Sequence, residues 1–132
     1  MQVIDAMHHY TVHQHANVHR ASYPRAAEAT RCYETARQRI ATFINASAEH
    51  LSLQPSSTVA LNMLAQVAID WQPGDEILVS AAEHHANFIP WQMLANKHQL
   101  KLVVAPVCRQ TGVLESFDKF ISARTRLIAL TM

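Results

Sequence analysis

The sequence predicts an α/β domain with a largely parallel sheet; the order of its segments predicts this class, and its length and composition limit the size of the domain and the kind of site. Short apolar segments alternate with helical segments, at spacings long enough for crossover connections between parallel strands. The chain has 132 residues, a common size for one domain, and 49% of them are hydrophobic, which is enough for a packed core. Only 2 glycines are present, where average usage would give about 9, so a glycine-rich nucleotide loop is not expected.

Two helices are expected in the first third of the chain. Residues 2–15 have mixed helical character, and a polar loop at 17–23 ends at Pro24. Apolar residues then recur every three or four positions, which predicts a long amphipathic helix whose stripe is Ala29, Tyr33, Ala36, Ile40 and Phe43. Ser22 is a suitable N-cap for this helix, and Pro24 is tolerated in its first turn.

The remainder of the chain alternates strands with helices. The expected strands are 51–54, 77–80, 102–105 and 127–130. The expected helices are one that begins near Ser56-Ser57-Thr58, one at about 88–98 and a short one at 117–121. The two glycines lie in turns, at 73–75 and 110–112. The last apolar strand runs into the chain end, so a truncated domain is expected.

Charge and targeting signals narrow the function classes. Eleven basic and ten acidic residues give a net charge of +1, without a basic stripe for a nucleic acid. The N-terminus lacks a signal peptide, and no window reaches 18 apolar residues. Cys32 and Cys108 are too few for a disulfide framework. We therefore expect a cytoplasmic protein that binds neither nucleic acid nor a membrane.

The most informative segment, residues 80–87, follows a strand expected to be buried. An imidazole of His84 or His85 there would stand at the mouth of the sheet, able to stack on a planar ligand, move a proton or bind a metal. The alternative is an ordinary loop histidine beside a helix N-cap at Asn87. A metal needs three or four convergent ligands. Glu83, His84 and His85 are consecutive and diverge, so no metal site is predicted.

Two further segments suit anionic ligands. Ser56, Ser57 and Thr58 stand at a strand-to-helix junction, where free N–H groups and hydroxyls can bind a phosphate. Ordinary N-capping explains the same residues. His19 and Arg20, in the polar loop before the long helix, could hold an anionic substrate or simply be solvated.

Taken together, the sequence resembles the cysteine desulfurases and selenocysteine lyases, which belong to the class V aminotransferase-like group of pyridoxal-phosphate enzymes. The resemblance runs from about Gln2 to Thr131, and the segments that carry it are NVHRASY, YETARQRIATFINA, STVALNMLA, WQPGDEILVSAAEHHANFIPWQ and TRLIAL. It implies part of the large domain of a fold type I enzyme, with a mostly parallel sheet and flanking helices. Residues 1–48 would form N-terminal helices and a substrate-side loop, and residues 49–132 the first part of the cofactor-binding domain.

The resemblance implies a role for several residues. His84 looks like the histidine that stacks on the pyridine ring of pyridoxal 5'-phosphate and helps proton transfer. Ser57 and Thr58 match the two small residues that contact the cofactor phosphate. Asn87 and Trp91 match positions that shape the loop and helix behind the stacking histidine, and Asn87 is assigned to cofactor binding.

The resemblance also implies a substrate side and an activity. His19 falls in the VHR motif that lines the substrate entrance, and Arg20 is assigned with it to substrate binding. The intact enzyme would convert L-cysteine, or selenocysteine, to L-alanine and leave sulfur on its own cysteine as a persulfide. A homodimer and a sulfur-acceptor protein are the partners that the family implies.

The chain also departs from the family pattern. Residues 55–62 read PSSTVALN where the family usually has Arg-Gly-Thr-Thr-Glu-(Gly/Ser)-Ile-Asn. The Schiff-base lysine and the catalytic cysteine of the family would lie beyond Met132, and Lys97, Lys101 and Lys119 do not match the Ser-x-His-Lys pattern. The rival interpretation is therefore a degenerate, inactive binding module of the same fold. A histidine-rich metal-binding protein is a third, disfavoured by ligand geometry.

Overall fold

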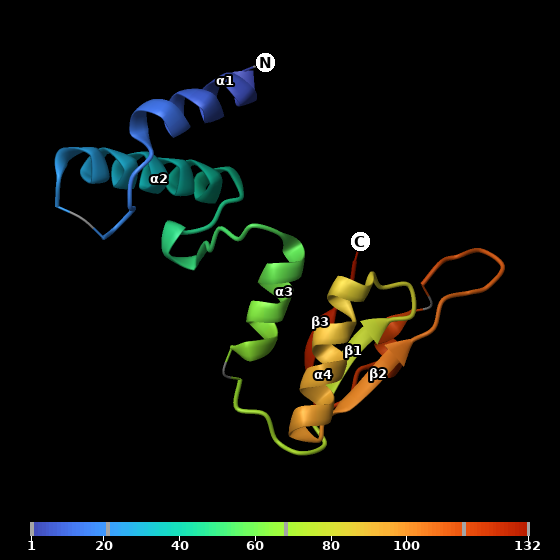
Figure 1. The fold of residues 1–132 in the computed structure, drawn as a ribbon. Coiled ribbons are helices and arrows are strands. Elements are labelled where there is room, and N and C mark those ends of the chain that lie inside the picture. The colour runs from blue at the N-terminus through green and yellow to red at the C-terminus, as the bar shows by residue number, and fades with distance from the viewer. Residues whose placement is uncertain (1, 21, 68, 115, 132) are drawn as a thin grey trace. The chain divides into compact units, whose positions relative to one another are not determined.

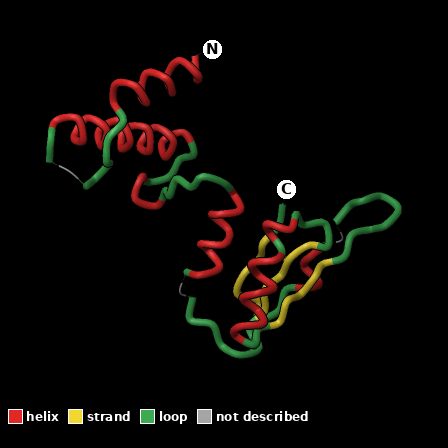
Figure 2. The backbone as a smooth tube through the Cα atoms, viewed as in Figure 1, coloured by secondary structure: helices red, strands yellow, loops and turns green. Residues whose placement is uncertain are grey.

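The computed structural model describes residues 2–20, 22–67, 69–114 and 116–131. The chain divides into two compact units, Met1–Leu53 and Gln54–Met132, and each is described by itself. Figure 2 shows that the first unit is built of helices and loops, whereas the strands belong to the second unit. In these described ranges, no helix is both long enough and apolar enough to cross a membrane.

The first unit contains the two helices that the sequence predicts. Helix α1, Gln2–His9, continues into a π-helical turn, Tyr10–Gln14, and helix α2 spans Pro24–Phe43 (Figure 1). A short 3-10 turn follows at Ala48–His50. The prediction of Ser22 as N-cap of α2 is wrong. The cap residue is Tyr23, which is extended (φ −81°, ψ 154°) and makes no side-chain cap bond, because a residue before proline is held out of the helical region.

The second unit is an α/β structure with an all-parallel sheet, as predicted. Strands β1 (Glu76–Ser80), β2 (Lys101–Ala105) and β3 (Thr125–Ala129) pair in the order β2-β1-β3. Its helices are α3 (Ser57–Gln66) and α4 (Ile89–His98), together with 3-10 turns at His85–Asn87 and Phe117–Phe120. The expected short helix at 117–121 is therefore a single 3-10 turn.

The predicted strand at 51–54 does not form in the structure. Leu51 has an extended backbone (φ −107°, ψ 121°), but the segment belongs to no sheet. Alternating apolar residues are compatible with extended backbone, yet a strand also needs a neighbour with which to exchange hydrogen bonds. The sheet of the described residues consists of β1, β2 and β3 alone.

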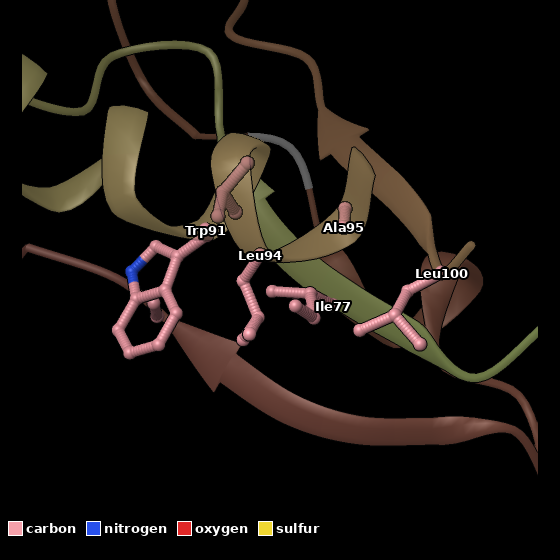
Figure 3. Close-up of a cluster of buried hydrophobic side chains, with 7 residues drawn as sticks. Ile77, Trp91, Leu94, Ala95 and Leu100 are labelled. Atoms are coloured by element: carbon pink, nitrogen blue, oxygen red, sulfur yellow. The ribbon is translucent and has the colours of Figure 1, made fainter. Parts of the chain in front are cut away.

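The core of the second unit lies between β1 and α4. Ile77 and Val79 of β1 are fully buried, and they share one face of the strand because side chains alternate. Trp91 and Leu94 of α4 pack against this face, as Figure 3 shows for the labelled side chains. The central strand is buried along its whole length, as expected for a parallel strand covered on both faces.

The strand register positions the candidate site. Ser80 pairs with Ala105, and Val79 pairs with Ala129, so the three strands end at the same level. The chain that leaves β1 and the chain that leaves β3 therefore emerge together. We call this region, which includes residues 80–87 and 130–131, the carboxyl end of the sheet. Ligands of open α/β sheets bind at such ends.

Candidate functional site

A carboxylate lies at the centre of the polar contacts at the carboxyl end of the sheet. Oε1 of Glu83 accepts hydrogen bonds from the Ser80 hydroxyl (2.8 Å) and the Thr131 backbone N–H (2.9 Å). Oε2 accepts from the Asn87 side-chain amide (2.7 Å) and the Thr131 hydroxyl (2.7 Å). Four donors from three segments thus converge on one side chain.

The hydrogen bonds keep Glu83 ionised. Partial burial acts to raise the pKa of its carboxyl, but the hydrogen bonds from Thr131, Asn87 and Ser80 outweigh that effect, and the net pKa lies below the ordinary value. An ionised carboxylate has no proton to donate and accepts only. All four donors can therefore point at Glu83 at neutral pH.

His84 follows directly and caps the 3-10 turn His85–Asn87. Its backbone is extended (φ −62°, ψ 144°), and its Nδ1 accepts the backbone N–H of Ala86 at 3.1 Å. Because Nδ1 accepts, the neutral ring carries its proton on Nε2. The side chain is exposed, and its ring lies 6.3 Å from the His85 ring, centroid to centroid, at an interplanar angle of 58°.

The expectation that Asn87 caps helix α4 is wrong. The cap residue of α4 is Phe88, because the 3-10 turn is inserted before the helix. The Asn87 side chain is instead buried. Its Nδ2 donates to Glu83, and its Oδ1 accepts the indole N–H of Trp91 at 3.0 Å. Asn87 therefore connects the Glu83 cluster to the hydrophobic core.

The start of helix α3 is capped as the hydroxyl run predicts. Ser56 is extended (φ −159°, ψ 160°), and its Oγ accepts the backbone N–H of Val59 at 3.2 Å. Ser57 and Thr58 are the first two residues of the helix. The N–H groups of a first helical turn have no acceptor within the helix, so they are available to an anion.

A groove joins the start of α3 to the carboxyl end of the sheet. Its volume is about 550 Å³. Its lining residues are Ser57, Ala60, Leu61, Leu64, Val67, Ile69, Asn87, Trp91 and Leu127 to Thr131. Of the four residues that the resemblance assigns to cofactor binding, Ser57 and Asn87 line this groove, whereas Thr58 and His84 are not among its described lining residues.

The substrate-side candidates belong to the other unit, Met1–Leu53. His19 has a left-handed backbone (φ 61°), and its Nε2 lies 2.9 Å from Oε1 of Glu34 on α2. Arg20 is exposed.

The three lysines lie in other parts of the second unit. Lys97 is in the last turn of α4, and Lys119 is in the 3-10 turn Phe117–Phe120. Lys101 begins β2, and its Nζ lies 2.8 Å from Oε1 of Glu76, at the amino end of the sheet. Among the described residues, no group of three or more His, Cys, Asp or Glu side chains is placed to hold a metal ion.

Glu83 and Thr131 are the site residues that sequence reasoning missed. Both follow strands that end at the same level of a parallel sheet. A polar residue within three positions of the end of each of two neighbouring strands is the signal that could have found them.

Comparison with known proteins places this geometry in a family. The family model described as "Aminotransferase class-V" matches residues 1–132. A probable cysteine desulfurase of Vibrio cholerae is 44% identical over 133 residues, which cover 97% of this chain and 33% of that protein. A probable cysteine desulfurase of Mycolicibacterium paratuberculosis is 40% identical over 131 residues, covering 96% of this chain and 19% of the relative. The chain thus spans a third or less of the length of these relatives.

A solved structure agrees with the sequence matches. The apo cysteine desulfurase of Thermococcus onnurineus superposes with a TM-score of 0.83 and 32% identity, over 97% of this chain and 32% of that one. The sequence matches and the structural similarity therefore indicate the same family. The chain belongs to the aminotransferase class-V family.

Proposed function

We propose that this chain supplies cofactor- and substrate-binding elements of a pyridoxal-phosphate-dependent cysteine desulfurase, which converts L-cysteine to L-alanine and leaves the sulfur on an enzyme cysteine. One observation carries the proposal. The start of α3, the 3-10 turn after β1 and the residues after β3 line one groove at the carboxyl end of a parallel sheet. Family relatives at about 40% identity are named cysteine desulfurases.

The donors at the start of α3 fit the phosphate of the cofactor. Ser57 and Thr58 offer two hydroxyls and the N–H groups of a ten-residue helix, whose dipole favours an anion. Ser56 is occupied as the cap, so it orients the turn and leaves the next two residues to the ligand. Ser57 also lines the groove, which brings a phosphate donor to the same cavity as Asn87.

His84 fits the role of a ring that covers the cofactor. Its Nδ1 is held by the Ala86 N–H, so the exposed ring face and the Nε2–H remain for a ligand. Pyridoxal phosphate, when bound, supplies an electron sink that stabilises a carbanion. In this proposal His84 holds or moves a proton at Nε2, while Glu83 fixes the loop through Asn87.

The substrate side of the proposal rests on His19 and Arg20. The Arg20 guanidinium can pair with the carboxylate of an amino-acid substrate, cysteine or selenocysteine, in two parallel hydrogen bonds. The proposal includes the homodimer, the sulfur-acceptor protein and the cytoplasmic location that the resemblance implies.

Cofactor binding can be tested on the 132-residue chain. Pyridoxal phosphate absorbs where tryptophan emits, and the indole of Trp91 lines the groove, so binding should quench tryptophan fluorescence saturably. Pyridoxal, which lacks the phosphate, should bind at least about tenfold more weakly, since it loses the charge-assisted hydrogen bonds at α3. H84A should weaken binding, and its matched control H85A should not. Absence of saturable binding, or equal binding of pyridoxal, would overturn the cofactor assignment.

The activity itself is tested on the protein that carries this chain. Incubation with L-cysteine, pyridoxal phosphate and a thiol, which reduces the enzyme persulfide and releases its sulfur as sulfide, should give alanine and sulfide in equal amounts, the alanine measured by mass spectrometry. Cofactor binding without alanine would favour the inactive binding module over the enzyme.

A further inference from the structure

We infer that Glu34 is a positioning residue, which fixes the tautomer and orientation of the His19 imidazole so that Nδ1 is the nitrogen left for a substrate. The inference rests on the proposed function only for the role of His19 toward substrate. The geometry that carries it lies within the unit Met1–Leu53.

Three residues of α2 contact His19. The ring nitrogen Nε2 lies 2.9 Å from Oε1 of Glu34. The backbone N–H donates to the hydroxyl of Thr30 at 3.1 Å. The ring meets the ring of Tyr33 edge to face, with centroids 5.9 Å apart and an interplanar angle of 89°. Positions 30, 33 and 34 lie on one face of a helix, so α2 presents a single surface to this residue.

The backbone of His19 is itself in an unusual conformation. Its φ of 61° is left-handed, which is uncommon for a residue other than glycine and persists only where the surroundings hold it. Thr30 supplies part of that support. Its hydroxyl donates to the carbonyl of Ala26 (2.8 Å), which orients its oxygen to accept the His19 N–H.

The charge state of Glu34 decides which ring nitrogen carries the proton. Arg37 donates two N–H groups to Oε2 of Glu34, at 2.8 and 3.0 Å. This pairing with Arg37, opposed by partial desolvation and assisted by His19, holds the pKa of Glu34 below its ordinary value. An ionised carboxylate only accepts, so Nε2 of His19 must be the donor.

The remaining nitrogen, Nδ1, is therefore an acceptor in the neutral ring. No described residue donates to it, and the His19 side chain is 54% exposed. A neutral imidazole fixed in this way can accept a proton or hydrogen bond from an ammonium or a thiol. An amino-thiol such as cysteine carries both groups, which is the substrate class that the proposed function gives to this protein.

The tautomer is tested by nitrogen-15 NMR of the histidine rings in the 132-residue chain. In the wild type, His19 should give the shifts of an imidazole protonated on Nε2 at a pH where the ring is neutral. E34A should abolish this preference, whereas E34Q should keep it, because the amide oxygen still accepts the N–H. The matched control is E28A, since Glu28 forms an ion pair with Arg31 on the same helix and does not contact His19.

Two results would overturn the inference: a wild-type His19 protonated on Nδ1, or an E34A chain that keeps the wild-type tautomer. Should E34A fail to fold, as its amide spectrum would show, E34D makes the same test, because its carboxylate is one methylene group shorter and the weakened contact with Nε2 should weaken the preference for this tautomer.

A second readout separates this inference from the proposed function. In the active protein that carries this chain, E34A should raise the KM for cysteine by about tenfold, with kcat changed by less than threefold. E34Q should have a smaller effect, and E28A none. If the protein releases no alanine, the proposed function fails while the tautomer experiment still decides the role of Glu34. If E34A leaves both tautomer and KM unchanged, the role of Glu34 is wrong even in an active enzyme.

Discussion

Glu83 accepts two hydrogen bonds from Thr131, one from its backbone N–H and one from its hydroxyl, although the two residues are 48 positions apart in the chain. The contact joins the loop after β1 to the residues after β3. The same carboxylate holds Asn87, which in turn holds Trp91. The order of the carboxyl end of the sheet therefore depends on one ionised side chain.

Replacing this carboxylate should change how stability depends on pH. The pKa of Glu83 is lowered in the folded protein, so its contribution is present above the unfolded pKa of about 4.3 and is lost as pH falls through the folded value. E83Q should remove that contribution and lower the free energy of unfolding at pH 7 by about 1–3 kcal/mol. Denaturant melts from pH 3 to 7 measure both effects.

The pKa values of Glu34 and Glu76 are also lowered, so these two carboxylates contribute to the pH dependence of stability in the same experiment. The wild type and E83Q share this contribution, so the difference between their free energies of unfolding at each pH reports Glu83 alone. That difference should shrink as the pH falls below 4. Two curves that stay parallel across the range would show that Glu83 does not titrate with unfolding.

Substitutions of the two adjacent serines at the start of α3 should affect different properties, stability for Ser56 and ligand binding for Ser57. Ser56 caps the helix through the Val59 N–H, so S56A should cost about 1 kcal/mol of stability. Ser57 makes no such cap and lines the groove. S57A should therefore leave the melting temperature nearly unchanged and weaken the binding of pyridoxal phosphate. Thermal melts and fluorescence titrations of both variants make the comparison; a reversal of the two results would contradict the assignment of Ser57 to the phosphate.

Local signals allowed much of the fold to be predicted from the sequence. The apolar segments that became β1, β2 and β3, and the hydroxyl that caps α3, depend on neighbours within a few residues. The errors arose where the local structure depends on a distant segment or on an inserted turn. Residues 51–54 do not join the sheet of the described residues, which consists of β1, β2 and β3. The 3-10 turn at His85–Asn87 makes Phe88, and not Asn87, the cap residue of α4.

The candidate site was predictable only in part for the same reason. His84, Ser57 and Asn87 could be selected from segments that follow strands or begin helices. Glu83 could not be distinguished from an ordinary loop carboxylate, because its donors come from segments before it, after it and at the far end of β3. Likewise, nothing local to Glu34 shows that Nε2 of His19, 15 positions away, lies against it.

The position of the lysines predicts how the chain reacts with added pyridoxal phosphate. Lys101 is paired with Glu76 at the amino end of the sheet, and Lys97 and Lys119 lie on a helix end and in a 3-10 turn. Borohydride reduction of the 132-residue chain after pyridoxal phosphate is added should therefore leave no single lysine modified in preference to the others. Peptide mass mapping gives the modified fraction of each. A lysine labelled to completion, with the other two unlabelled, would contradict the placement.

The Trp91 indole should stabilise the protein through its hydrogen bond as well as through the packing of its ring. It is 2% exposed and donates to Oδ1 of Asn87 at 3.0 Å. W91F keeps most of the packing but leaves a buried acceptor without its donor, which costs about 1–3 kcal/mol. L94A, in the same core cluster, costs about 2–5 kcal/mol through the lost methyl groups and the cavity. Both variants should melt early, but only W91F should release Asn87 and speed amide exchange at Ala86 and Asn87 under native conditions. Equal acceleration in both would mean that packing alone, and not this hydrogen bond, orders the loop that carries His84.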